Sequence, residues 1–114
     1  MEHVRGPKMT AATDSVLRLL LLDPAREMYG LELVRAAGLA TGTIHPILAR
    51  LEACGWLESR WEDLDPHAAG RPRRRYYRLS PDGVVGAARA VDRRASAAAR
   101  PQRVPRGVVA EGST

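Results

Sequence analysis

The sequence predicts a mainly α-helical fold with one small β-hairpin, and three patterns in the chain of 114 residues support this prediction. Apolar residues recur at helical spacing in the stretches before residue 56. The spacing then changes to two, as in half-buried strands, on either side of a turn-rich stretch. Helical spacing returns after Ser80 and continues to residue 100.

The first helix is predicted from Thr10 to Leu22, where TAATDSVLRLLLL is rich in apolar side chains and Pro24 disfavours helical geometry at the residue before it. Its leucines lie on more than one side of the helix. Burial of several sides in so small a protein indicates a central position in the core or a second subunit. The preceding residues 1–9 show no periodicity, so we expect a flexible arm there.

A short second helix is predicted in MYGLELVRAAG, with Leu31, Val34 and, more weakly, Ala37 on its apolar face. Gly38 follows this face, and glycine suits the left-handed conformation of a C-terminal cap. Only the connection LATGT separates this helix from the next. Two short helices so close together in the sequence form a helix-turn-helix.

The third helix is predicted over residues 41–54, with Thr41 or Thr43 as its N-cap. Its apolar positions follow one stripe of a helix and comprise Ile44, Ile47, Leu48 and Leu51. Pro46 is expected in or just after the first turn, where amide groups have no partner within the helix, so that little hydrogen bonding is lost. Gly55 follows the helix as a second glycine cap.

Apolar and polar residues alternate in residues 57–62 and again in RRRYYRLS, where Tyr77 and Leu79 share one face. The stretch DLDPHAAGRP between these strands has the composition of a turn. Together they predict a β-hairpin with a long tip. Ser80 and Pro81 then provide the N-cap and the first residue of a fourth helix.

Three helices followed by a hairpin make the winged helix-turn-helix arrangement, in which the third helix enters the DNA major groove and the hairpin, or wing, lies beside it. The DNA-binding domain is therefore predicted to span residues 10–80. Residues 81–100 form the predicted C-terminal dimerisation helix. Residues 101–114 have neither periodicity nor core residues, and we expect them to be disordered.

Charge is distributed unevenly along the chain. Residues 1–70 carry seven Lys and Arg against ten Asp and Glu, a net charge of −3, whereas residues 71–106 carry eleven Arg against Asp82 and Asp92, a net charge of +9. Such a basic segment indicates a polyanionic partner, because clustered guanidinium groups repel one another unless water or phosphate screens them. We expect double-stranded DNA rather than a membrane surface, since the fourth helix lacks large apolar residues.

The candidate DNA-binding residues lie on the third helix and in the wing. On the polar face of the third helix they are Thr41, Gly42, Thr43, His45, Pro46 and Arg50. In the wing they are Arg71, Arg73, Arg74, Arg75 and Arg78. Strand alternation separates Arg73 and Arg75 from Arg74 and Arg78, so the five cannot all face one duplex. We expect Arg71, near the tip, to enter a minor groove and the others to contact phosphates.

We expect a homodimer held through the first and fourth helices, because a domain of this size cannot bury two apolar helices completely. Small residues on the fourth helix permit close approach by another helix, either the first helix of the same subunit or the partner's copy of the fourth. The predicted interface residues are Val16, Leu17, Leu20, Val84, Ala87, Ala88, Val91 and Ala95.

The chain has no signature of catalysis, and we predict neither a cofactor nor a metal site. Cys54 is the only cysteine and the three histidines are scattered, which excludes an intrachain disulfide and a cysteine cluster for zinc. There is no glycine-rich phosphate loop and no nucleophile beside a base. No apolar run reaches the roughly 18 residues of a membrane span and no signal peptide is recognisable, so we expect a cytoplasmic protein without membrane contact.

Only 4% of the residues are aromatic, which leaves no platform for unstacked bases and makes single-stranded RNA the less supported partner. We expect these side chains to pack in the core and the hairpin, and they are Tyr29, Trp56, Trp61, Tyr76 and Tyr77. Contact of Trp61 or Tyr76 with a small-molecule effector stays open.

The segment YGLELVRAAGLATGTIHPILARLEACGWLESRWED, followed by GRPRRRYYRLSPDG, resembles the PadR family of transcriptional regulators over roughly residues 10–84. The resemblance rests on Tyr29-Gly30, Gly42-Thr43, Pro46, Leu48, Arg50-Leu51, Gly55, the basic run after Gly70, Tyr76-Tyr77 and Leu79. It implies a dimeric DNA-binding repressor with a winged-helix fold, in which a C-terminal helical part completes the dimer. His45 stands where the family usually has tyrosine, which bears on base preference.

These patterns predict a sequence-specific regulator that binds a roughly palindromic operator as a dimer, with half-sites about one helical turn apart. The alternative is a winged-helix module that binds another protein and has lost DNA binding. The basic wing favours DNA.

Overall fold

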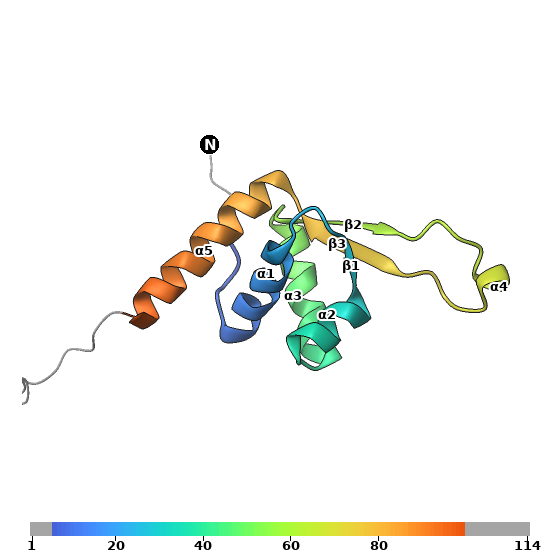
Figure 1. Cartoon of the computed structure of the whole chain (residues 1–114), viewed down its shortest axis with the longest axis horizontal. Coiled ribbons are helices and arrows are strands. Elements are labelled where there is room, and N and C mark those ends of the chain that lie inside the picture. The colour runs from blue at the N-terminus through green and yellow to red at the C-terminus, as the bar shows by residue number, and fades with distance from the viewer. Residues whose placement is uncertain (1–5, 100–114) are drawn as a thin grey trace, which may run out of the picture.

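The computed structural model describes residues 6–99 of the chain. Its elements are α1 (Ala11–Leu22), β1 (Met28–Tyr29), α2 (Gly30–Ala37), α3 (Thr41–Ala53), β2 (Leu57–Trp61), α4 (Pro66–Ala69), β3 (Arg75–Leu79) and α5 (Pro81–Ala99). Figure 1 shows α1, α2 and α3 packed together, with α5 along one side and the hairpin β2–β3 projecting on the other. The predicted helical fold with a small hairpin is confirmed. The predicted flexible arm and disordered tail fall largely on residues 1–5 and 100–114, outside the described residues.

Helix α1 buries one face and leaves another side uncovered. The Thr10 side chain caps the helix by accepting a hydrogen bond from the Thr13 amide at 3.1 Å. The buried residues are Thr13, Val16, Leu17 and Leu20. Leu22, however, is 80% exposed, so part of the leucine excess of this helix stays uncovered within the single chain.

Helix α2 buries a different leucine from the one that the sequence predicts. Leu33 is fully buried, whereas Leu31 is 47% exposed. Strand β1 places Met28 in the core and thereby fixes the rotation of the helix that begins at Gly30. Leu31 and Leu33 are two residues apart and therefore lie on nearly opposite sides of it. Gly38 adopts the left-handed conformation with φ of +67°, as predicted for the C-cap.

Helix α3 follows α2 after a very short connection. The chain turns so tightly after α2 that Ala40 is already the N-cap and Thr41 the first helical residue. The Leu39 amide still donates to the Val34 carbonyl of α2, at 3.4 Å. The prediction that Thr41 or Thr43 caps the helix is therefore wrong, because both already have helical backbone.

The three strands form one antiparallel sheet in the order β1-β3-β2. The sequence does not predict β1, because two residues are too few to show a period. Tyr77 and Leu79 are buried, as predicted, and Leu57 pairs with Leu79 over the core. Trp61 lies four residues further along β2 and is 58% exposed, so its predicted burial is wrong. Over these four residues the strand extends by about 13 Å, so that Trp61 lies beyond the helices that cover Leu57.

The stretch between β2 and β3, for which the sequence predicts only a turn, contains the short helix α4 at the wing tip. The Asp65 carboxylate caps this helix by accepting a hydrogen bond from the His67 amide at 3.0 Å. Gly70 ends it in the left-handed conformation, with φ of +70°. The wing tip is therefore an ordered lobe and not a simple turn.

Helix α5 begins as predicted, with Ser80 as its N-cap and Pro81 as its first residue. The Ser80 hydroxyl accepts a hydrogen bond from the Gly83 amide at 2.9 Å and donates one to the Gly55 carbonyl at 2.6 Å. This hydroxyl therefore joins the start of α5 to the end of α3. Gly83 lies directly against the backbone of Trp56, where no side chain would fit.

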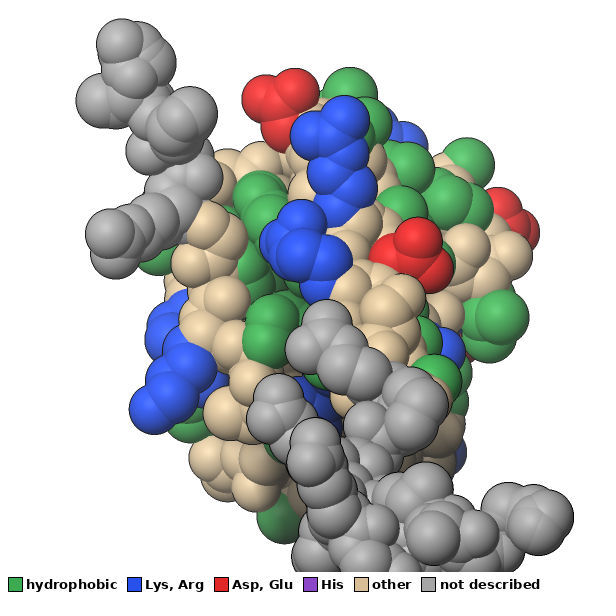
Figure 2. Space-filling model, turned by 90° about the vertical axis from the view of Figure 1, so that its left-hand side faces the viewer, with side chains coloured by type: hydrophobic (Ala, Val, Ile, Leu, Met, Phe, Trp, Pro, Cys, Tyr) green, Lys and Arg blue, Asp and Glu red, His purple; other side chains and the backbone are tan. Residues whose placement is uncertain are grey.

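The structure changes the predicted set of dimer residues. Four of them are buried within the single chain and are not free to contact a second copy, namely Val16, Leu17, Leu20 and Ala87. Val84 and Val91 are half-buried, while Ala88 and Ala95 are exposed. Figure 2, which faces the α5 side of the molecule, shows hydrophobic side chains on the surface beside basic ones.

Candidate nucleic-acid interface

The polar face of α3 is open to solvent. All of its predicted site residues are exposed, namely Thr41, Gly42, Thr43, His45, Pro46 and Arg50. The opposite face is buried in the core and comprises Ile44, Ile47, Leu48 and Leu51. The helix therefore presents a row of polar groups from a backbone that the core holds in place.

The N-terminus of α3 adds backbone donors to this face. The amides of Thr43 and Ile44 both donate to the Ala40 carbonyl, at 2.9 and 3.0 Å. Within the described residues, the amides of Thr41 and Gly42 have no such partner, and no side chain caps the helix. Free amides at the positive end of a helix dipole are a favourable place for an anion such as phosphate.

Pro46 is the sixth residue of α3 and not part of its first turn, because the helix begins at Thr41. A residue at this position would normally donate its amide to the Gly42 carbonyl, and proline has no amide hydrogen to donate. The expectation that Pro46 costs little hydrogen bonding is wrong, because proline at this position leaves one hydrogen bond within the helix unmade. The exposed ring fixes the backbone in the middle of the polar face.

His45 lies over the start of α2. Gly30 is the first residue of α2, and a Cβ atom added there would lie 3.7 Å from Cε1 of His45. The exposed imidazole therefore lies where the polar face of α3 meets the N-terminus of α2. Histidine presents two ring nitrogens at this junction, either of which can meet a base or a phosphate.

Ion pairs neutralise much of the basic wing. Three of the five candidate arginines pair with carboxylates, and the pairs are Arg71–Glu62 at 2.8 Å, Arg75–Glu52 at 3.4 Å and Arg78–Glu58 at 3.4 Å. The partners lie 9 to 23 residues apart in the sequence, so that local patterns give no sign of them. Arg71, the candidate for minor-groove entry, is therefore already engaged in the free chain.

The remaining two wing arginines have no carboxylate partner within residues 6–99. Arg73 is exposed, and its Nε donates to the Leu64 carbonyl at 2.9 Å. The Arg74 guanidinium lies over the Tyr29 ring, 4.2 Å from its centroid. Within the described residues, these are the two candidate wing arginines whose charge no ion pair offsets.

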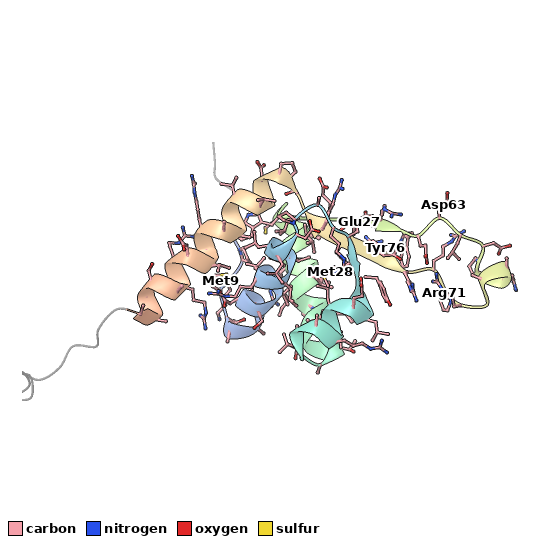
Figure 3. The ribbon with its side chains drawn as sticks, viewed as in Figure 1. Met9, Glu27, Met28, Asp63, Arg71 and Tyr76 are labelled. Atoms are coloured by element: carbon pink, nitrogen blue, oxygen red, sulfur yellow. The ribbon has the colours of Figure 1, made fainter. Side chains whose placement is uncertain are left out.

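A chain of aromatic and charged contacts, missed by sequence reasoning, ties the wing to the helix-turn-helix. Tyr29 of β1 and Tyr76 of β3 meet edge to face, with ring centroids 5.7 Å apart. The Arg60 guanidinium lies over Tyr76 and also makes two 2.7 Å hydrogen bonds to Glu27, which lower the pKa of that carboxyl group. Figure 3 shows Glu27 and Tyr76 near each other where the wing leaves the body. Only the pairing of β1 with β3 brings these residues together.

The wing tip has a hollow of about 690 Å³ that is open to solvent. It is lined by Trp61, Pro66, His67, Pro72 and Arg73. Arg75 covers Trp61 at 5.0 Å from the ring. Throughout the described part of the chain, no group of His, Cys, Asp or Glu could hold a metal ion, and no helix is long and apolar enough to cross a membrane.

Among solved structures, PadR of Bacillus subtilis in complex with operator DNA matches with a TM-score of 0.56 and 17% identity, over 84% of this chain and 52% of PadR. The chain thus spans about half the length of that protein. BpsR of Bordetella bronchiseptica, whose DNA binding is regulated by 6-hydroxynicotinic acid, matches with a TM-score of 0.60 and 22% identity, over 90% of this chain and 69% of BpsR. MepR of Staphylococcus aureus has a TM-score of 0.57 and 14% identity, over 93% of this chain and 67% of MepR. At these identities the likeness establishes the winged-helix fold.

Comparison with curated protein sequences finds no match. The sequence profile of the transcriptional regulator PadR-like family matches residues 19–89, which include every helix and strand from the end of α1 to the first half of α5. The match covers more than half of the chain, and the family consists of transcriptional regulators and not of enzymes. The chain therefore belongs to the PadR-like family of transcriptional regulators.

Proposed function

We propose that the protein is a dimeric, sequence-specific DNA-binding repressor that reads the major groove with α3 and holds the backbone with its wing. The observation that carries the proposal is the exposed polar face of α3, whose opposite face is buried in the core. A rigid helix with a free polar face beside a projecting hairpin matches the geometry that the major groove admits.

Each candidate on α3 has a role that suits its chemistry. Arg50 carries a planar fork that can pair with the two acceptors of a guanine edge or with a phosphate. Thr43 can donate to a phosphate or contact a thymine methyl group. The free amides of Thr41 and Gly42 suit a phosphate at the helix N-terminus, which would fix the depth of the helix in the groove.

The role of the wing differs from that expected of five free arginines. Arg73 and Arg74 are the arginines that we assign to phosphate or minor-groove contact, because Arg71, Arg75 and Arg78 are paired. PadR of Bacillus subtilis, a neighbour in fold, is known in complex with operator DNA, which supports a DNA partner for this chain.

A second copy of the chain completes the proposed site. Leu22 of α1 and Val85 of α5 are exposed hydrophobic residues, and Ala88 and Ala95 of α5 are exposed small residues. We assign these positions to contact with a partner helix. A two-fold dimer presents its recognition helices to half-sites about 34 Å apart, and the operator then repeats the symmetry of the protein. We also propose that the protein works in the cytoplasm, where its DNA partner would lie.

Selection of bound duplexes from a random-sequence pool tests the proposal. We expect enrichment of a roughly palindromic motif with half-sites about 10 base pairs apart. Sedimentation of the free protein at micromolar concentration should give twice the chain mass. A pool without any enriched motif would favour the alternative, a winged-helix module that binds another protein. A stable monomer in sedimentation would contradict the dimer.

The double variant Arg73→Ala with Arg74→Ala tests the wing. Each phosphate contact contributes about 0.9 to the slope of log affinity against log salt, so the variant should flatten the slope by about two units. The matched control is Arg89→Ala with Arg93→Ala, which removes two exposed arginines of α5. Equal slopes for the wing variant and the unchanged protein, measured by fluorescence anisotropy on a selected duplex, would remove the wing from the interface.

A further inference from the structure

The carboxylate of Glu62 is the most heavily hydrogen-bonded acidic group of the wing. It accepts hydrogen bonds from Nη1 and Nη2 of Arg71 at 2.8 and 3.0 Å. It also accepts one from the backbone amide of Arg74, at 3.1 Å. The Glu62 amide in turn donates to the Arg74 carbonyl at 2.7 Å. One side chain therefore joins the two strands of the hairpin just beyond the sheet.

This junction closes the wing tip. Strand β2 ends at Trp61 and β3 begins at Arg75, so Glu62 and Arg74 form the first pair outside the sheet. The lobe beyond them, residues 63–73, contains α4 and is held internally by the hydrogen bond from Arg73 Nε to the Leu64 carbonyl. Without the junction, a loop of this length would have to be ordered when DNA binds, at a cost in conformational entropy.

Arg71 is committed to this junction and is not available for DNA. Two of its nitrogens bind Glu62, and Nη1 also donates to the Pro72 carbonyl at 3.2 Å. Hydrogen bonds from the Arg71 side chain and the Arg74 amide lower the pKa of Glu62 to about 2, so the charged form of this carboxylate is the one that the junction stabilises. If Arg71 turned to a phosphate, it would leave this charge uncovered beside the polyanion, where like charges repel.

We propose that Glu62 and Arg71 are positioning residues, a clasp that preforms the wing tip and holds Arg73 ready for the DNA backbone. The proposal rests on the proposed function for its DNA partner. It predicts the opposite of what charge alone would predict for the effect of this carboxylate on DNA affinity. A carboxylate near DNA should weaken binding, and its removal should strengthen it, whereas loss of this carboxylate should weaken binding because the carboxylate orders the lobe.

The test compares Glu62→Gln with Asp63→Asn, which remove the same charge at adjacent positions. Asp63 is exposed, has no hydrogen-bond partner within the described residues, and points away from the wing in Figure 3. On a duplex selected by the unchanged protein, Asp63→Asn should bind equally well or up to about twofold more tightly. Glu62→Gln should bind about fivefold more weakly, as expected when about 1 kcal/mol of a charged hydrogen-bond network is lost. Tighter binding by Glu62→Gln would overturn the proposal.

A second readout, independent of DNA, keeps the clasp separate from the proposed function. Hydrogen exchange at the Arg74 amide should become at least about tenfold faster in Glu62→Ala, which removes the acceptor, and stay unchanged in Asp63→Ala, because Glu62 is the only hydrogen-bond partner of that amide within the described residues. Unchanged exchange would refute the clasp even if DNA binding is lost. Faster exchange in a protein that binds no duplex at all would instead refute the proposed function and leave the clasp in place.

A lysine at position 71 separates the clasp from direct contact. Lysine keeps the positive charge that a phosphate needs but lacks the fork that grips both oxygens of Glu62. Arg71→Lys should therefore weaken binding about as much as Glu62→Gln does, while Arg78→Lys, which changes a single 3.4 Å contact with Glu58, should bind within about twofold of the unchanged protein. Full affinity in Arg71→Lys would contradict the clasp.

Discussion

Replacement of Gly83 by alanine should destabilise the protein by about 3 kcal/mol or more, at the upper end of what overpacking costs. A Cβ atom on Gly83 would lie 1.9 Å from the carbonyl oxygen of Trp56 and 2.7 Å from its carbonyl carbon. These are backbone atoms, so no rotamer change relieves the clash. The same carbonyl accepts a hydrogen bond from the Ser80 amide at 2.9 Å, which leaves it little freedom to move. Urea unfolding followed by circular dichroism measures the loss.

Gly42→Ala is the matched control for this prediction. Gly42 is also helical, but a Cβ atom there would meet no atom within 4 Å. Alanine has the higher helix propensity, so this variant should be as stable as the unchanged protein or up to about 1 kcal/mol more stable. If Gly83→Ala unfolded at the same urea concentration as Gly42→Ala, α5 would not dock against Trp56 as described.

Replacement of Thr43 by aspartate should abolish DNA binding and leave the fold intact. Thr43 is exposed in the first turn of α3, where a negative charge interacts favourably with the helix dipole and raises stability by up to about 1 kcal/mol. In the proposed complex the same carboxylate would face phosphates and base edges, and like-charge contact costs several kcal/mol. We expect at least about a hundredfold loss of affinity for a selected duplex, measured by fluorescence anisotropy.

Ala11→Asp controls for both effects of the new charge. Ala11 is the exposed first residue of α1, so aspartate there adds the same charge and also meets a helix N-terminus. This variant should retain its affinity within about threefold. If Thr43→Asp lost no more affinity than Ala11→Asp, the polar face of α3 would not be the DNA-binding surface, whatever the rest of the protein does.

The parts of the fold that the sequence predicts well are those set by local chemistry. The apolar stripe of α3 is buried as its spacing indicates, since helical geometry alone decides which side chains share a face. Ser80 and Pro81 begin α5, and Gly38 ends α2, because each suits a backbone position that few residues fill well. These preferences act over a few residues and can therefore be read from the sequence.

The parts that sequence reasoning misses depend on distant neighbours. Leu33 and not Leu31 enters the core, because Met28 in β1 sets the rotation of α2, and β1 itself exists only through pairing with β3. Trp61 follows the alternation of its strand yet is exposed, because the hairpin extends beyond the helices that cover its base. Alternation in a sequence shows which face of a strand a residue lies on. It does not show how far along the strand the helices cover that face.

The candidate site divides in the same way. The exposed face of α3 follows from the stripe opposite it, so the sequence suffices to nominate Thr43 and Arg50 for DNA contact. In the wing, the basic run is evident, but the state of each arginine depends on carboxylates contributed by other elements. Glu52 of α3 reaches Arg75, for example, across 23 positions of sequence. A count of charges along the chain therefore overstates the charge that the wing presents.

The hairpin is held on both of its faces, by Tyr29 and Tyr76 on one side and by Glu52 with Ser59 and Arg75 on the other. These contacts connect the wing to α3 and β1, so we expect the wing and α3 to move together. In the dimer that we propose, a signal that turned the protein off would therefore act on how the two subunits lie relative to each other, in spacing or in angle.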